Sequence, residues 1–298
     1  MTTLNDAAIQ RLRVAAMWPV LPGERYRDVT LLARGGMGTI YRAFDAVLAR
    51  DVAIKVSNAV ASASDLDARL ADESRTLAAL EHPGIVPVHD AGVLTDGRSF
   101  YVMRLITGPT LAAHRDTVGA LGARLSLLER VADTVAFAHA RGITHRDLSP
   151  SNIMMGDFGD VLVLDWGVAQ RSADPDGLRV GTPGFMAPEA RTGHGSGPAT
   201  DIYALGQLLD WMCEGQTIDR RLRAIVTRCT ETAPADRYPS VGALLHDLAA
   251  YRAGAPMTAY RESRLERAHQ WMRRHQLMLW LIAAYIAMRA ALIWYLRR

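Results

Sequence analysis

The chain has 298 residues, of which 49% are apolar and 22% charged, and this globular composition excludes a mainly disordered or fibrous protein. A formal net charge of only +3 gives no reason to expect nucleic-acid binding. Two cysteines, Cys213 and Cys229, are too few for a disulfide framework, so a reduced cytosolic environment is expected for most of the chain. The first 30 residues contain no uninterrupted apolar stretch and predict no secretory signal peptide.

The pattern of residues divides the chain into a leader at 1–24, a central region at 25–253 and a basic, then apolar, stretch from 254 onward. Apolar residues at helical spacing in the leader predict a short helix. Docking of this helix on the central region and a role in binding a partner both remain open.

The central region begins with strand-like patterns and ends with helix-like ones. Its first half predicts strands around a glycine cluster and at 52–56, 85–89 and 99–105, with a helix at 65–80. An Asp96-Gly97 turn signal precedes the last of these strands, as in a hairpin. The second half predicts helices at 121–141, 200–213, 218–230 and 240–252, interrupted by short strands at 153–155 and 161–164. A β-rich part followed by an α-rich part indicates an α+β fold with two lobes.

The glycine cluster is Leu32-Ala33-Arg34-Gly35-Gly36-Met37-Gly38. Glycines between two strands let backbone N–H groups approach phosphate oxygens, although many such clusters are ordinary hairpin turns. Lys55 follows 17 residues after Gly38, in Val-Ala-Ile-Lys, where its ammonium could hold phosphates as a point charge. An isolated lysine on a strand is more often part of a solvated face.

Three further segments carry charged, polar and glycine residues that could belong to a site. They are His145-Arg146-Asp147-Leu148-Ser149-Pro150-Ser151-Asn152, Asp165-Trp166-Gly167, and Gly181-Thr182-Pro183-Gly184-Phe185-Met186-Ala187-Pro188-Glu189. Together with the glycine cluster and Lys55 they occur in one order and at compatible spacings, which excludes coincidence.

On these motifs, residues 25–253 resemble the eukaryotic-like, or Hanks-type, Ser/Thr protein kinases of bacteria. The resemblance implies a bilobal kinase fold with a β-rich N-lobe and an α-rich C-lobe. It also implies that ATP and Mg²⁺ bind in the cleft and that the substrates are Ser/Thr hydroxyls of proteins. Phosphoryl transfer agrees with such residues, because it needs positioned cations and an oriented hydroxyl rather than covalent help.

The resemblance also assigns roles to residues. It implies Asp147 as the catalytic base, Lys55 as the cation on the α/β-phosphates, Glu73 as its partner on a helix, and Asn152 and Asp165 as Mg²⁺ ligands. Met103 matches the gatekeeper position, Arg104 to Ile106 the hinge, and Met154 the side chain beneath adenine. The implied nucleotide-binding residues are Ala33, Gly35, Gly36, Gly38, Ile40, Ala53, Lys55, Met103, Ile106 and Met154.

The resemblance also implies roles for residues outside the nucleotide site. Glu189 is expected to pair with Arg237, and Asp201 matches the buried anchor that orders the catalytic loop. Thr182 lies where a hydroxyl normally orders that loop by hydrogen bonding.

The sequence departs from the family at several positions. Ser149 replaces the lysine that usually contacts the γ-phosphate, which removes one cation and is the main support for a pseudokinase. Ala33 replaces the first glycine of the loop and Trp166 the usual phenylalanine, both with small expected effects. Because the segment after Cys213 leads almost directly into the helix predicted at 218–230, the family's αG region is expected to be missing.

The activation segment carries only two hydroxyl residues, Ser172 and Thr182, between Asp165 and Glu189. We predict that activity needs no phosphorylation there, because the nearby carboxylates of Asp174 and Asp176 can serve Arg146 as permanent partners. The alternative is that these aspartates only form a solvated turn.

Residues 277–296 are apolar except for Arg289, and twenty helical residues match the thickness of a bilayer core. We therefore predict a transmembrane helix here after a basic juxtamembrane linker at 254–276, with a helix buried on the kinase domain or lying in the membrane plane as alternatives. The excess of arginine before the span predicts a cytoplasmic kinase domain in a single-pass protein of the cell membrane.

Three functions compete at this point. The first is an active Ser/Thr protein kinase anchored in the membrane. The second is a nucleotide-binding pseudokinase scaffold, and the third is a small-molecule kinase of similar fold, against which the Gly-Thr-Pro to Ala-Pro-Glu segment argues.

Overall fold

A computed structural model describes most of the central region and a C-terminal helix. The described residues are 19, 21, 23–35, 38–58, 65–166, 170–171, 182–192, 197–260, 272 and 275–296. The predicted leader helix and the residues Gly36, Ser172, Asp174 and Asp176 lie outside them.

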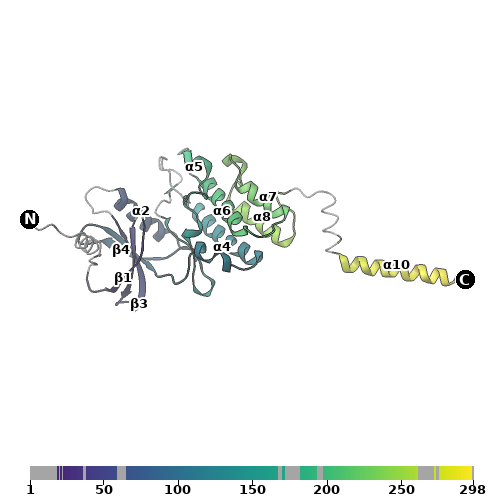
Figure 1. Ribbon diagram of the computed structural model, residues 1–298, viewed down its shortest axis with the longest axis horizontal. Helices are drawn as coiled ribbons and strands as arrows, with labels where there is room; N and C mark the ends of the chain where they lie inside the picture. The colour runs from purple at the N-terminus through teal and green to yellow at the C-terminus, as the bar shows by residue number, and fades with distance from the viewer. Residues whose placement is uncertain are drawn as a thin grey trace, which may run out of the picture.

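The N-lobe is a five-stranded antiparallel sheet in the order β1-β2-β3-β5-β4, with helix α2 beside it (Figure 1). Its elements are β1 Tyr26–Arg34, β2 Gly38–Asp45, β3 Arg50–Ser57, α2 Asp65–Ala79, β4 Val88–Val93 and β5 Ser99–Arg104. Alternation along β3 gives the sheet two different faces. Ile54 and Val56 pack in an apolar cluster with Tyr41 and Val102 on one face. Lys55 therefore points to the other face.

The C-lobe is built mainly of helices (Figure 1). Its helices and strands are α3 Leu111–His114, α4 Leu121–His139, β6 Ile143–Thr144, β7 Ile153–Met155, β8 Val161–Val163, β9 Gln170–Arg171, α5 Pro188–Thr192, α6 Pro198–Cys213, α7 Arg220–Cys229 and α8 Val241–Ala253, with short 3₁₀ turns at Arg115–Thr117, Pro150–Asn152, Asp157–Gly159 and Pro234–Asp236.

Local sequence signals explain where two of these helices begin and why they are buried. The carboxylate of Asp219 accepts the N–H of Leu222 to cap α7, and Ser240 caps α8 in the same way. The buried residues of α7 recur at i, i+3, i+4 and i+7, from Leu222 to Cys229, so that one face of the helix joins the core. Both cysteines are free and buried.

The segment after α8 is fixed to the C-lobe through Asp247. This fully buried carboxylate accepts hydrogen bonds from the N–H and hydroxyl of Thr258, both at 2.8 Å, from the N–H of Ala259 at 2.8 Å and from the hydroxyl of Tyr238 at 2.9 Å. Burial opposes ionisation of Asp247, but these hydrogen bonds outweigh it and hold its pKa below the usual value.

Within the described residues of the central region the predicted elements are present, with one clear error. The strand predicted at 85–89 is wrong in its bounds, because β4 is Val88–Val93 and Ile85 instead forms an isolated bridge with Val163. Ile85 is buried in the apolar cluster that also contains Val163 of β8, so its burial does not come from the sheet of the N-lobe. As predicted, α6 is followed closely by α7, and no helix lies in the six described residues between them.

The predicted C-terminal helix forms as α10, Gln276–Leu296. Among the residues that the structure describes, however, no helix has the combination of length and apolar character needed to cross a membrane. The expected membrane span is thus unsupported by the structure, although the helix itself is present.

Candidate active site

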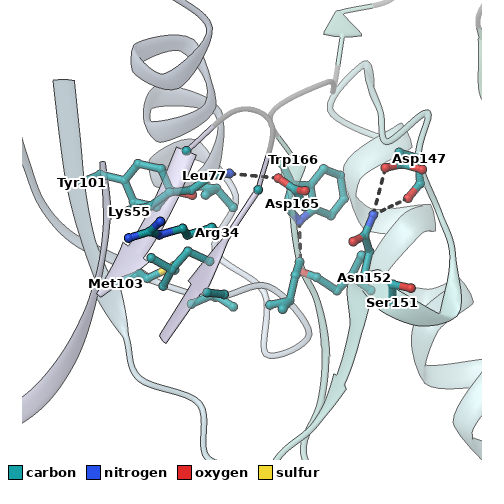
Figure 2. Close-up of a pocket in the computed structure, with 17 residues that line it drawn as sticks. Arg34, Lys55, Leu77, Tyr101, Met103, Asp147, Ser151, Asn152, Asp165 and Trp166 are labelled. Carbon is teal, nitrogen blue, oxygen red and sulfur yellow. Dashed lines mark hydrogen bonds and ion pairs between the residues drawn. The ribbon is translucent and has the colours of Figure 1, made fainter. Parts of the chain in front are cut away.

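A cavity of about 420 Å³ lies between the sheet of the N-lobe and the loops of the C-lobe. Figure 2 shows Lys55 and Tyr101 on one side, Asp165 and Trp166 facing them, and Asn152 next to Asp147 further along. Ala33, Arg34, Gly35 and Gly38 of the glycine cluster line the cavity, and Gly38 must be a glycine there. A Cβ at this position would lie 2.7 Å from the carbonyl oxygen of Val56.

Lys55 is the centre of a buried charge network. Its Nζ donates to both carboxylate oxygens of Glu73, at 2.8 Å each, and to Oδ1 of Asp165 at 2.9 Å. Burial opposes its charge, but Glu73 and Asp165 outweigh that penalty and hold the pKa of Lys55 above its usual value. The lysine therefore stays cationic at neutral pH, as an ammonium that binds phosphates must.

The pKa values of the two carboxylates in this network shift in opposite directions. Burial opposes ionisation of Asp165, yet the charge of Lys55 and its hydrogen bond lower the pKa of Asp165 overall. Burial raises the pKa of Glu73, against the opposing effects of Lys55 and the Tyr101 hydroxyl. Asp165 is thus held ionised where it faces the cavity.

Asp147 lies at the other end of the cavity, oriented by two neighbours. Its Oδ1 accepts the N–H and the hydroxyl of Thr182, both at 2.8 Å, as expected for Thr182. The amide of Asn152 donates to Oδ2 at 3.1 Å and to the backbone carbonyl of Asp147 at 2.8 Å. Oδ2 accepts fewer of these bonds than Oδ1 and keeps lone pairs for a substrate hydroxyl.

Asp201 anchors the backbone of the catalytic loop by hydrogen bonds. Its buried carboxylate accepts the N–H groups of His145 and Arg146, both at 2.8 Å, and contacts Nε2 of His139 at 2.7 Å. Arg146 has a φ of 72° and Asp165 one of 63°, conformations that cost energy in residues other than glycine and that cluster at functional sites. The expected anchor role of Asp201 agrees with this geometry.

Trp166 fills the position of the usual phenylalanine. It is 1% exposed, packs its ring 4.6 Å from that of His145, and donates its Nε1–H to the carbonyl of Val163 at 3.1 Å. The indole N–H therefore has a partner, which is the condition for burying tryptophan. The expected pairing of Glu189 with Arg237 is also present, with two N–O distances of 2.6 and 2.8 Å.

Ser149 does not face the cavity. Its side chain is fully buried, and its hydroxyl has no hydrogen-bond partner within the described part of the chain. Ser151, two residues later, lines the cavity instead. At position 149 the structure thus offers no substitute for the missing lysine.

The cavity brings together most of the residues expected at the nucleotide site. Ala33, Gly35, Gly38, Ile40, Lys55 and Met103 line it. Ala53, Ile106 and Met154 do not, although Ala53 lies directly across from Met103 in the sheet. Lining residues that the resemblance did not assign to the nucleotide site are Arg34, Leu77, Val86, Tyr101, Ser151, Val163, Leu164 and Trp166. For Tyr101 the strand alternation was a usable signal, because Tyr101 and Met103 share one face.

Asn152 and Asp165 fit the donor set expected for Mg²⁺. No group of three or more His, Cys, Asp or Glu side chains suited to a metal occurs among the described residues. Mg²⁺ commonly takes only one or two protein ligands and fills its octahedron with waters and substrate phosphates. The carboxylate of Asp165, 44% exposed toward the cavity, and the amide oxygen of Asn152 meet that requirement.

Comparison with known proteins decides the family. The family model of the protein kinase domain matches residues 26–238. The chain belongs to the protein kinase family. The match covers both lobes of this kinase, from the first strand of the sheet to the residues just before α8.

Similar proteins are bacterial kinases. The kinase is 32% identical to the serine/threonine-protein kinase PknD of Chlamydia pneumoniae, an alignment that covers 78% of this chain and 32% of PknD. It is 40% identical to the serine/threonine-protein kinase PknA of Mycobacterium tuberculosis over 61% of this chain and 45% of PknA. The kinase domain of M. tuberculosis PknI superposes with a TM-score of 0.62 at 25% identity, covering 78% of this chain and 98% of that domain. The kinase therefore spans less than half the length of the curated relatives that it matches.

Proposed function

We propose that this protein is an ATP-dependent Ser/Thr protein kinase acting in bacterial signalling, with its catalytic domain at 25–253. The observation that carries the proposal is the arrangement around one cavity of a paired cation, Lys55, and an oriented carboxylate, Asp147. The names of the similar proteins PknD and PknA support Ser/Thr residues as acceptors.

The residues supply positioning and charge rather than covalent chemistry. Oδ2 of Asp147 orients the substrate hydroxyl, whose oxygen forms the new bond to the γ-phosphorus while the bond to the β–γ bridging oxygen breaks. The hydroxyl proton passes to Asp147 late in the reaction. Lys55 holds the α/β-phosphates. Mg²⁺, held by Asn152 and Asp165, would neutralise charge on the phosphate oxygens.

The competing function is a nucleotide-binding pseudokinase. Ser149 favours it, because a buried serine cannot supply the cation that usually contacts the γ-phosphate. Against it, Lys55, Glu73, Asp147, Asn152 and Asp165 are all present and paired in the manner that transfer requires.

The decisive experiment is transfer of labelled γ-phosphate to the protein itself and to a generic basic protein. The wild type is compared with Asp147→Asn, which keeps the shape of the side chain but cannot accept the proton. We expect transfer to Ser/Thr with the wild type and a loss of at least about 100-fold in the variant. Binding of ATP without transfer would establish the pseudokinase, and transfer only to small molecules would establish the third alternative.

We further propose that α10 attaches the kinase to a membrane. The described side chains of α10 include large apolar residues that are exposed, namely Trp280, Leu281, Ile282, Tyr285, Ile286, Met288 and Trp294. Exposed apolar surface of this extent marks an interaction site, and the arginine-rich stretch that precedes it favours the cytoplasmic face.

Deletion of residues 277–298 tests this attachment. The shortened chain should move from the membrane fraction to the soluble fraction. Carbonate extraction of membranes that carry the full-length chain then distinguishes the two modes of binding. A helix that spans the bilayer stays with the membrane, whereas a helix that lies in the interface is released. A shortened chain that stays with membranes would contradict the proposal.

A further inference from the structure

Tyr101 contacts both members of the buried ion pair. It lies on β5 directly opposite Lys55 of β3, in the antiparallel register that places both side chains on the same face of the sheet. Its hydroxyl donates a 3.0 Å hydrogen bond to Oε1 of Glu73. Its ring also lines the nucleotide cavity, with Nζ of Lys55 5.9 Å from the ring centroid.

All three groups are removed from water, since Lys55 is 6%, Glu73 3% and Tyr101 2% exposed. A buried carboxylate needs a donor for each oxygen that water no longer reaches. Burial, and next the charge of Glu73, raise the pKa of Tyr101 well above its ordinary value. The phenol therefore stays protonated and serves Glu73 as a permanent donor.

The proton count at Lys55 shows why this donor is needed. An ammonium has three protons, and Lys55 already faces three oxygens, two on Glu73 and one on Asp165. A phosphate that binds Lys55 must therefore replace one of these carboxylate oxygens as the acceptor of a lysine N–H. Oε1 of Glu73 can lose its hydrogen bond from Lys55 and still have a donor, because it keeps the hydrogen bond from the Tyr101 hydroxyl.

We propose that Tyr101 is a positioning residue that holds Glu73, and with it helix α2, in the catalytically productive position while Lys55 is shared with the phosphates of ATP. Tyr101 touches neither the hydroxyl acceptor nor the transferred group in this proposal and acts through Glu73. The proposal rests on the proposed kinase function.

The test compares Tyr101→Phe with a chemically matched control, Tyr238→Phe. Tyr238 is also 2% exposed and also donates to a buried carboxylate, that of Asp247 at 2.9 Å, but it lies in the C-lobe away from the cavity. Both variants lose one hydroxyl bound to a carboxylate, so both should lose similar stability in urea unfolding.

Activity should separate the two variants. The Tyr101 hydroxyl donates to a charged group, and hydrogen bonds of this kind are stronger than those between neutral groups. We expect Tyr101→Phe to lower kcat/KM for ATP by about tenfold and Tyr238→Phe to leave it within about twofold. Removing the donor raises the pKa of Glu73, so the acidic limb of the rate profile should shift to higher pH only in Tyr101→Phe.

Two further measurements keep the outcome decisive. Amide hydrogen exchange in the described part of α2 should speed up in Tyr101→Phe and not in Tyr238→Phe, whether or not the protein transfers phosphate. In a Glu73→Gln background the effect of Tyr101→Phe on exchange should shrink, because the charged acceptor is gone.

The failures are distinguishable. Equal transfer by wild type and Asp147→Asn would refute the kinase function while the exchange measurement still tests Tyr101. The positioning role would be overturned if Tyr101→Phe and Tyr238→Phe showed the same amide exchange in α2 and the same acidic limb of the rate profile. This holds even if transfer by the wild type is strong.

Discussion

Lys55→Met should destabilise the protein by stranding the charge of Glu73. Glu73 is buried and takes two of its three hydrogen bonds from Lys55, with Tyr101 giving the third. Removing one partner of a buried ion pair costs about 3–5 kcal/mol, a large share of the roughly 5–15 kcal/mol by which a domain is stable. Asp165 adds little to this cost, because its side chain is 44% exposed.

The loss should depend on pH. Without Lys55 the folded-state pKa of Glu73 rises further above its unfolded value of about 4.3. A raised pKa means that the folded state binds the proton more readily, so acid favours folding. The destabilisation is therefore greatest above the folded-state pKa, at neutral pH, and shrinks as the pH falls toward the unfolded value.

Urea unfolding, followed by tryptophan fluorescence at pH 7.5 and 5.5, measures both effects. The matched control is Lys55→Met/Glu73→Gln, which removes the stranded charge and still accepts the Tyr101 hydroxyl. We expect the double variant to recover at least about half of the loss at pH 7.5, with phosphate transfer absent in both variants. A loss below about 1 kcal/mol in the single variant, or no recovery in the double variant, would refute the reasoning.

Further changes test other parts of the site. Ser149→Lys should lower the unfolding midpoint and leave kcat no higher than that of the wild type, because the side chain at position 149 is buried and does not face the cavity; a raised kcat would show that the added cation reaches the phosphates after all. Asp201→Asn should lower both kcat and the unfolding midpoint, because an amide cannot accept two backbone N–H groups as two carboxylate oxygens do; a fully active, equally stable variant would contradict that role. In protein stripped by phosphatase, Ser172→Ala should stay active and Asp174→Asn/Asp176→Asn should be impaired. The reverse result would establish a phosphorylation switch.

The motifs made the centre of the site predictable from sequence. Lys55, Asp147, Asn152 and Asp165 occur at spacings that a kinase requires, and strand alternation and helical periodicity indicated the two lobes around them. These signals are local or have a fixed order along the chain, so they survive without knowledge of the packing.

Other features depend on contacts that the sequence does not encode locally. The strand predicted at 85–89 is displaced because Ile85 bridges to Val163, far along the chain, and is buried in the same apolar cluster. Apolar residues alone do not say which neighbours bury them. The burial of Ser149 and the bond from Tyr101 to Glu73 are likewise set by tertiary packing, so that no motif marked them.

The bonds that Asp247 makes to Thr258 and Ala259 determine where the chain can be shortened. A protein cut after residue 253, the end of α8, would keep the buried carboxylate and lose three of the four hydrogen bonds described above. The loss of these hydrogen bonds to a charged group, together with that of the buried side chain of Met257, destabilises the C-lobe by several kcal/mol, in the range of about 1.5–3 kcal/mol for each such contribution. A protein cut after residue 260 keeps the complete set, and it is therefore the shorter version expected to survive purification.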